Sequence, residues 1–200
     1  MLYKLLTDKI LDHLALNTNI DMAHREIYAY SLEKYISGIV DFIIFAIVAV
    51  VCGIMKETLV FALFYGPIRK FAGGYHAKTR TRCLILSIIT LLSVVKLARG
   101  LAFLNYWNFL SLFLLLIAGI LIFWLAPEDS ENRRLSVELK NLFRRKARWI
   151  FVADCIFLIL AVAFLGAFKD YVLIGVLAVF LEGIILIPDK LTLRQRYASR

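Results

Sequence analysis

The chain has 200 residues, of which 62% are hydrophobic, and its formal net charge is +9. Soluble domains contain roughly 45–50% apolar residues, and here the excess falls in long blocks, which predicts an integral membrane protein and excludes an ordinary soluble domain. The basic residues lie between the blocks, as the positive-inside rule requires. No nucleic-acid-binding motif accompanies them, so nucleic acid is not an expected partner.

Residues 1–36 are predicted to form N-terminal interfacial helices. Leucines at helical spacing within residues 1–16 predict an amphipathic helix lying on the bilayer. A helix packed on the membrane domain fits the same pattern equally well. Residues 17–21 should interrupt it, and a second helix should begin near Met22 and continue into the first span. No short apolar core followed by small residues indicates a cleavable signal peptide.

Apolar blocks follow at residues 37–55, 58–68, 83–98, 101–125, 149–168 and 171–187. A span needs about 20 residues, and the second block is short. Counting it as a crossing places the basic loops 69–82 and 126–148 and the basic tail 188–200 on the cytoplasmic side. The short turns predicted at Lys56-Glu57 and Lys169-Asp170 then face outside. We therefore expect an all-α protein with six transmembrane helices, the second one short, in a membrane domain over residues 37–187.

The segment 69–83, RKFAGGYHAKTRTRC, is the most informative stretch of the chain. It is basic and contains one of the three histidines and one of the three cysteines. A cysteine nucleophile needs a base, positive charge that favours the thiolate, and access to substrate. His76 and Cys83 in a cationic loop at a membrane surface meet these needs, although a histidine and a cysteine in one loop can also be incidental.

The spacing of His76 and Cys83 requires the segment to fold back. Seven residues of continuous helix would separate them by about 10.5 Å along the axis. Proton transfer needs about 2.6–3.2 Å or a bridging water. Gly73 and Gly74 permit the necessary turn.

Cys83 opens the third apolar block. Thr79 or Thr81 is placed to cap the helix that starts there, which would put Cys83 in its first turn. The positive end of the helix dipole, together with Arg80 and Arg82, would then favour the thiolate.

The remaining cysteines and histidines show no sign of chemistry. Cys52 and Cys155 lie inside apolar blocks, where cysteine behaves as a small hydrophobe. His13 and His24 lie in the N-terminal segment, away from any cysteine. No CxxC motif or Cys/His cluster is present, so we expect neither a metal site nor a cofactor.

Four acidic residues lie toward the cytoplasmic side in the six-span topology: Glu33, Asp41, Asp154 and Glu182. Acids inside a membrane are costly and are candidates for function. Any of them could orient His76 or pair with Arg69. A structural ion pair between helices is the alternative for each.

The run RKFAGGYHAKTRTRC resembles the signature of the AgrB family, the accessory gene regulator B proteins of Gram-positive bacteria. These are membrane cysteine endopeptidases that process quorum-sensing peptide precursors. Residues 126–135, APEDSENRRL, are similar to the Ala-Pro-acid loop that follows the fourth span in the family. Residues 30–33, YSLE, resemble its Tyr-Gly-Leu-Glu segment, with Ser31 in place of the glycine.

The resemblance implies that Cys83 attacks a peptide bond of an AgrD-type propeptide while His76 accepts the thiol proton and then protonates the leaving amine. The peptide would remain as a thioester until its own cysteine closes a thiolactone ring, which gives the autoinducing peptide. Supporting or orienting roles are implied for the residues around the pair: Glu33, Arg69, Gly73 and Gly74.

The resemblance also implies a homodimer in the cell membrane of a Gram-positive bacterium, with both termini and the catalytic loop in the cytoplasm. Substrates of the family carry an acidic C-terminal tail. Basic residues are expected to dock that tail: Lys70, Arg133, Arg134, Lys140, Arg144 and Arg145. Arg69 and Lys70 would serve equally well as anchors of the loop.

Two other classes of function compete with the enzyme. A small transporter that exports a peptide would have an incidental thiol, but it would need a polar pathway at the midplane or internal repeats, and no repeat is visible. A membrane-bound scaffold protein is the second alternative. Loss of activity on modification of Cys83 alone would distinguish the enzyme from both.

Overall fold

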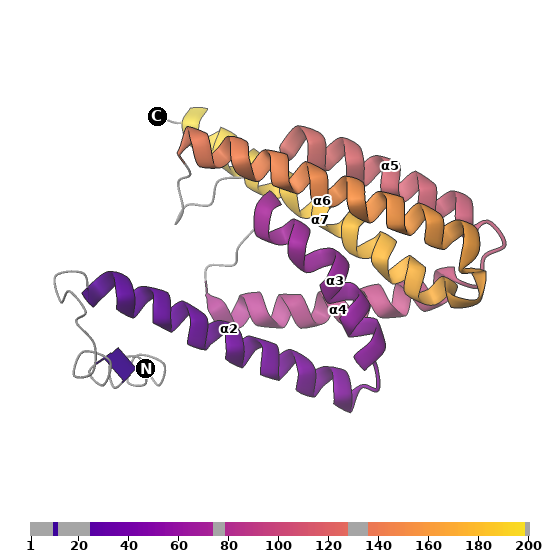
Figure 1. Ribbon diagram of the computed structural model, residues 1–200, viewed down its shortest axis with the longest axis horizontal. Coiled ribbons are helices and arrows are strands. Elements are labelled where there is room, and N and C mark those ends of the chain that lie inside the picture. The colour runs from indigo at the N-terminus through magenta and orange to yellow at the C-terminus, as the bar shows by residue number, and fades with distance from the viewer. Residues whose placement is uncertain (1–9, 12–24, 74–78, 128–135, 199–200) are drawn as a thin grey trace. The chain divides into compact units, whose positions relative to one another are not determined.

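The computed structural model describes residues 10–11, 25–73, 79–127 and 136–198, and this part of the chain is helical and contains no strand (Figure 1). The predicted helix over residues 1–16 lies outside the described residues except for Ile10 and Leu11. The helices are α2 (Arg25–Val51), α3 (Met55–Ala72), α4 (Arg80–Leu101), α5 (Trp107–Leu125), α6 (Val137–Phe164), the short 3₁₀ helix η2 (Gly166–Phe168) and α7 (Lys169–Ala198). The all-α class predicted from the sequence is confirmed.

The chain divides into two compact units, residues 1–53 and 54–200. In the first unit, α2 runs without interruption from Arg25 to Val51. It begins close to the start predicted near Met22 and continues into the first apolar block, as expected. Residues Ser31–Val51 of α2 form the first stretch that is long and apolar enough to span a membrane.

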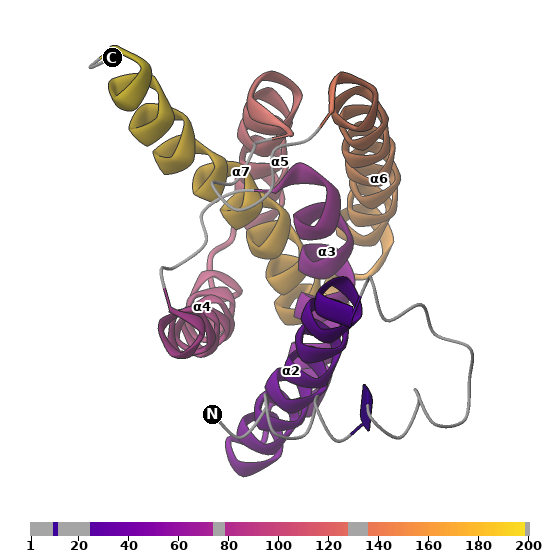
Figure 2. The same cartoon turned by 90° about the vertical axis from the view of Figure 1, so that its left-hand side faces the viewer.

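In the second unit, α7 is the central helix, and α3, α4, α5 and α6 all pack against it. Figure 2 shows α7 crossing between α4 on one side and α3 and α6 on the other. Residues 172–179 are buried without interruption, so this part of α7 is enclosed on every side. That burial explains why its sequence is apolar all round rather than along one stripe.

Glycines let neighbouring helices approach α7 closely. A Cβ atom at Gly175 would lie 2.8 Å from Leu158 Cδ2 and 3.0 Å from Phe64 Cδ2. At Gly183, it would lie 3.2 Å from Leu121 Cβ. Membrane helices pack through small residues of this kind because burying more apolar surface gains little in lipid.

Among the described residues, five helical stretches are long and apolar enough to cross a membrane, and α3 is not one of them. With 18 residues, α3 is about 27 Å long, and it is the shortest of the helices α2 to α7, as expected for the second block. A count of six spans stays a prediction.

The turns between spans differ from those predicted at Lys56-Glu57 and Lys169-Asp170. Those residues form the first turns of α3 and α7. Helix α2 is followed instead by a turn at residues 52–53, where Gly53 has φ of +66°, and residues 165–168 separate the long helices α6 and α7. Glu57 and Asp170 are compatible with helix because an acidic side chain in a first turn interacts favourably with the helix dipole.

One end of the second unit collects the C-terminal ends of α3, α5 and α7 and the N-terminal ends of α4 and α6 (Figure 1). At the opposite end, Arg99 near the end of α4 donates a 2.6 Å hydrogen bond to Glu57 Oε1 at the start of α3. The antiparallel pair α3–α4 is therefore joined by an ion pair at one end and by the segment that contains His76 at the other.

Candidate active site

Cys83 lies in the first turn of α4, as predicted. Thr79 is the N-cap residue, with an extended backbone at φ −124° and ψ 144°. The Cys83 N–H donates to Thr79 O at 3.1 Å. The side chain of Thr79 makes no capping hydrogen bond, so Thr79 caps through its backbone conformation alone. The Cys83 side chain is half-buried.

The segment before Cys83 is not a continuous helix. Helix α3 ends at Ala72, and Gly73 follows with φ of +82° and ψ of −137°, a conformation that favours glycine. Helix α4 begins only at Arg80. The predicted break at the glycine pair is therefore confirmed at Gly73. Gly74 and His76 lie outside the described residues, so their roles stay predictions.

Arg69 joins the end of α3 to the middle of α7. Its Nη1 atom donates a 2.8 Å hydrogen bond to Gly73 O, and the Gly73 N–H donates back to Arg69 O at 3.2 Å. The same Nη1 atom lies 3.6 Å from Glu182 Oε1. Arg69 thus links the last turn of α3 to an acid on the central helix.

Glu182 is the acid that pairs with Arg69. Its side chain is completely buried, whereas that of Arg69 is 18% exposed. Neither carboxylate oxygen of Glu182 has a hydrogen-bond partner, and at 3.6 Å the contact with Arg69 is an ion pair rather than a hydrogen bond. Of the four candidate acids, Glu182 is the one that pairs with Arg69, and the pair is also an ion pair between helices, which was the alternative given for each acid.

Tyr65 lies near both this ion pair and Cys83. It lies one helical turn before Arg69 and within electrostatic range of Arg69, Glu182 and Cys83. Its ring stacks on Phe61 with 4.9 Å between centroids. The sequence analysis missed Tyr65, although its i, i+4 spacing from Arg69 is a signal that the two share a helix face.

The other acidic candidates are distributed over two helices. Glu33 and Asp41 both lie on α2, in the first unit, and the Glu33 side chain is exposed. Asp154 lies on α6 of the second unit, where its Oδ2 atom is buried without a hydrogen-bond partner. Roles for these three acids stay predictions.

Among the predicted tail-binding residues, Lys70 at the end of α3 comes close to the basic part of α6. Phe71 packs edge-on against Phe143 of α6 at 5.5 Å between centroids. Lys70 and Lys146 both place their Nζ atoms over the Phe71 ring, at 5.7 and 5.3 Å. Arg133 and Arg134 lie outside the described residues.

Lys140, Arg144 and Arg145 lie on the first half of α6. Arg144 and Arg145, but not Lys140, line a pocket of about 370 Å³ between α6 and the end of α5. Arg148, one turn further along α6, lines the same pocket, and it was not among the predicted site residues. Within the part of the chain that the structure describes, no group of His, Cys, Asp and Glu side chains is arranged to hold a metal ion.

Comparison with known proteins places the whole membrane region in one family. Residues 7–186 match the sequence model of AgrB, described as Accessory gene regulator B. A protein of Clostridium perfringens strain SM101 that is described as AgrB-like is 25% identical over 150 residues, which cover 72% of this chain and 68% of the relative.

Two further relatives agree. A second AgrB-like protein, from Clostridium perfringens strain 13, is 26% identical over 148 residues, covering 72% of this chain and 67% of the relative. FsrB of Enterococcus faecalis strain OG1RF is 21% identical over 159 residues, covering 80% of this chain and 63% of the relative. No solved structure matches the chain.

Proposed function

The chain belongs to the AgrB family, which is associated with the processing of AgrD-type propeptides in quorum sensing, and we propose that it is a membrane-embedded cysteine endopeptidase acting on such a propeptide. Cys83 is the nucleophile and His76 is the general base and acid. The enzyme removes the C-terminal tail of the propeptide and keeps the remaining peptide as a thioester.

The observation that carries this proposal is the position of Cys83. It lies in the first turn of α4. The segment that precedes α4 contains His76 and follows Gly73, the residue after α3 whose φ is positive. Backbone N–H groups at a helix N-terminus favour negative charge, both on a thiolate and on the oxyanion that forms when a thiolate attacks a carbonyl. The Cys83 thiol therefore lies where the positive end of the helix dipole would stabilise both the thiolate and the oxyanion of acyl transfer.

The first half-reaction transfers the acyl group to the enzyme. His76 takes the proton of the Cys83 thiol, and the thiolate attacks the scissile carbonyl carbon. The tetrahedral intermediate collapses with cleavage of the C–N bond. The leaving amine receives the proton from His76, so the tail departs as a neutral amine or ammonium. A Cys83 thioester remains.

The second half-reaction releases the peptide as a ring. A cysteine thiol of the bound peptide gives its proton to His76 and attacks the thioester carbonyl. The Cys83 sulfur leaves as a thiolate and regains the proton. One thioester replaces another, so the reaction is nearly isoenergetic and needs no external energy source. The site must exclude water while the thioester exists.

Arg69 and Glu182 support this chemistry by fixing where the catalytic segment leaves α3. The Arg69 guanidinium holds the Gly73 carbonyl at 2.8 Å, and the buried Glu182 carboxylate on α7 holds the guanidinium. Because α7 is enclosed by the other helices of its unit, it is a rigid support. Catalytic groups need support of this kind because small displacements strongly lower the rate.

The charge distribution and the family resemblance lead us to propose the setting of the enzyme. It spans the cell membrane of a Gram-positive bacterium six times, with both termini and the catalytic segment in the cytoplasm, and acts as a homodimer. Basic residues before α4 and α6 face the side from which an AgrD-type propeptide arrives.

A reconstituted assay tests the proposal. Purified protein in lipid nanodiscs is incubated with an AgrD-type propeptide, and the released tail is measured by chromatography. We expect Cys83→Ser to abolish tail release. The matched control is Cys155→Ser, which removes another half-buried thiol from α6 and should retain near-normal activity. Normal cleavage by Cys83→Ser would rule out this protein as the cysteine endopeptidase.

A further inference from the structure

The pocket between the end of α5 and the first half of α6 has one polar wall and one apolar wall. Its volume is about 370 Å³. Its polar lining comes from α6, and its apolar lining comes from both helices. The lining residues are Asn141, Arg144, Arg145 and Arg148 on the polar side and Phe123, Trp149 and Val152 on the apolar side.

Arg148 is held at the back of the pocket by the end of α5. Pro127 has no N–H, so the Phe123 carbonyl cannot receive its usual helical hydrogen bond. Arg148 Nη2 donates to that carbonyl at 2.9 Å, and the guanidinium lies over the Phe123 ring at 5.1 Å. The Arg148 Nε atom is buried and has no hydrogen-bond partner.

The positive charge of the pocket is not balanced by protein carboxylates. Within the part of the chain that the structure describes, the ion pairs involve Arg69 and Arg99, and neither Arg144 nor Arg145 pairs with an acid. Three guanidinium groups within five residues of one helix, without an anion between them, attract a ligand that carries negative charge. Guanidinium groups are well matched to phosphate oxygens because they donate in pairs.

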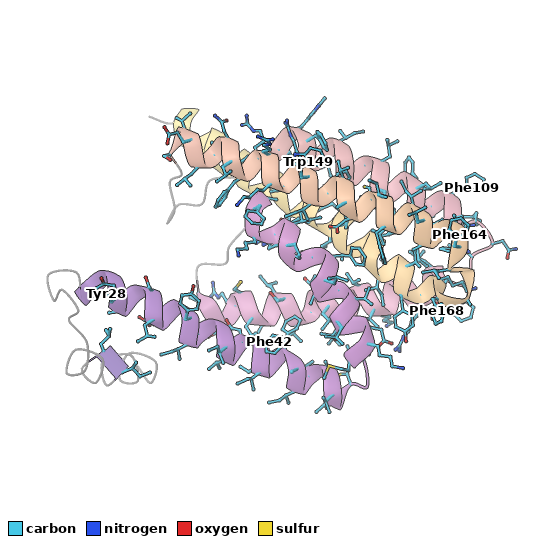
Figure 3. The ribbon with its side chains drawn as sticks, in the orientation of Figure 1. Tyr28, Phe42, Phe109, Trp149, Phe164 and Phe168 are labelled. Atoms are coloured by element: carbon cyan, nitrogen blue, oxygen red, sulfur yellow. The ribbon has the colours of Figure 1, made fainter. Side chains whose placement is uncertain are left out.

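The pocket lies where the apolar parts of α5 and α6 end. Trp124 at the end of α5 is 80% exposed and Trp149 on α6 is 65% exposed. Exposed tryptophans at the ends of apolar helices mark the boundary between hydrocarbon and headgroups. Figure 3 shows Phe109, Phe164 and Phe168 at the opposite end of this unit, away from Trp149, and these phenylalanines are also exposed.

We propose that this pocket binds an anionic phospholipid. The phosphate lies against Arg144, Arg145 and Arg148. The glycerol and the first methylenes of the acyl chains lie against Trp149 and Val152. Basic pockets beside transmembrane helices on the cytoplasmic side are suited to such headgroups, and the apolar wall distinguishes a lipid from a free anion.

The sequence-based expectation assigned Arg144 and Arg145 to the acidic tail of a peptide substrate. A soluble acidic tail would gain from the guanidinium groups but not from an exposed tryptophan and a valine at the hydrocarbon boundary. The combination of both walls favours the lipid. The proposal does not depend on the catalytic role of Cys83.

Quenching of tryptophan fluorescence by brominated lipids tests the proposal on the full chain in mixed micelles. Brominated phosphatidylglycerol and brominated phosphatidylcholine are titrated separately. We expect phosphatidylglycerol to quench at a several-fold lower mole fraction, and we expect this difference to disappear in Trp149→Phe. Each of Arg144→Gln and Arg145→Gln should weaken the phosphatidylglycerol response roughly fivefold.

Lys146→Gln is the matched control. It removes one positive charge from the same helix, next to Arg145, but Lys146 faces Phe71 of α3 and does not line the pocket, so quenching should remain as in the unmodified protein. Circular dichroism checks that each variant is folded, and Arg145 is exposed, so its replacement should not disturb packing.

Three results would overturn the proposal. The first is equal quenching by the two lipids. The second is a loss of preference in Lys146→Gln as large as in Arg145→Gln, which would indicate only a diffuse surface charge. The third is displacement of phosphatidylglycerol by a soluble oligoglutamate peptide or by inorganic phosphate at equal concentration. That displacement would assign the pocket to peptide carboxylates or to a free anion.

Discussion

At the scale of single residues, Arg69 contacts two groups: the Gly73 carbonyl directly after α3 and the Glu182 carboxylate on α7. A fully buried carboxylate is unfavourable unless it is paired, and among the described residues the partner of Glu182 is Arg69. Arg69 in turn satisfies the Gly73 carbonyl. Glycine is required at that position because φ is +82°. The Arg69 and Glu182 side chains therefore hold the backbone at Gly73, directly after the end of α3.

Replacing His76 should stop the reaction at its first step. In His76→Gln, no base accepts the Cys83 proton, and we expect tail release to fall by about 10²–10⁴-fold, the range for general acid–base catalysis. Tail release is measured by chromatography with AgrD-type propeptide. His24→Gln serves as the control and should leave the rate unchanged. A His76→Gln enzyme with full activity would require a different base.

Breaking the ion pair between Arg69 and Glu182 should lower the rate of tail release strongly while the thermal unfolding midpoint changes little. We expect Glu182→Gln and Arg69→Gln each to lower the rate of tail release at least about tenfold, because the His76 segment is no longer held in position. The double variant should be no slower than the slower single variant, because both changes break one linkage.

Rates are compared with thermal unfolding in the same micelles. Multiplicative loss in the double variant would show that Arg69 and Glu182 act independently, contrary to the linkage described above.

At the scale of the helices, the site depends on close packing around α7. Gly175 faces Leu158 on α6 and Phe64 on α3. Phe64 lies on the same helix as Arg69, so spreading of α3 from α7 would also separate Arg69 from Glu182. The contact between Arg69 and Glu182 is thus coupled to the packing at Gly175 in the interior of the unit.

Gly175→Val should therefore be destabilising. The added carbons overfill the contact, and overpacking of this kind costs about 1–3 kcal/mol. We expect a lower thermal unfolding midpoint in detergent, measured by fluorescence. Gly100→Val is the matched control because nothing lies within 4 Å of a Cβ built there. Equal midpoints for the two variants would contradict the packing described for Gly175.

Many of the helices and the breaks between them were predictable from the sequence. Apolar blocks located the apolar parts of α2 to α7, and the glycine pair and the threonines correctly placed a helix break at Gly73 and Cys83 in the first turn of α4. These features are local, because hydrophobic runs and backbone preferences act over a few residues. Residues 137–148, predicted as part of a loop, instead form the start of α6, and residues 188–198, predicted as part of a tail, continue α7. The charged pairs Lys56-Glu57 and Lys169-Asp170 were wrongly taken as turns, because an acid also suits the start of a helix.

Other features depend on contacts between distant parts of the chain and were not predictable. Four acids were candidates for Arg69, and the family resemblance favoured Glu33, whereas the packing of α3 against α7 selects Glu182. Arg148 was counted as a loop charge, and its hydrogen bond to Phe123 requires the end of α5 to lie beside α6. The pocket at that junction has no signature in either helix alone.

At the scale of the whole molecule, the basic ends of the helices collect at one end of the second unit. Five stretches of the described chain are long and apolar enough to span a membrane. From the positive-inside rule, we propose that the start of α4, and with it Cys83, faces the cytoplasm.

Thiol labelling tests this orientation. Cys83, kept as the only cysteine by Cys52→Ser and Cys155→Ser, should react with a membrane-impermeant maleimide in inverted vesicles but not in intact cells. The reciprocal variant keeps only Cys52, which is exposed at the turn between α2 and α3, and it should show the opposite pattern. Labelling of Cys83 from outside the cell would reverse the topology and separate the site from a cytoplasmic substrate.

The central claim is that Cys83 forms an acyl-enzyme whose release is cyclisation. Intact-mass spectrometry tests it most directly, with enzyme and a propeptide whose own cysteine is replaced by alanine. The tail should leave once, and the enzyme should gain the mass of the remaining peptide. Hydroxylamine should remove that mass, and Cys83→Ser should never acquire a hydroxylamine-labile adduct. Full-rate appearance of a linear peptide acid, without any adduct on Cys83, would contradict the claim.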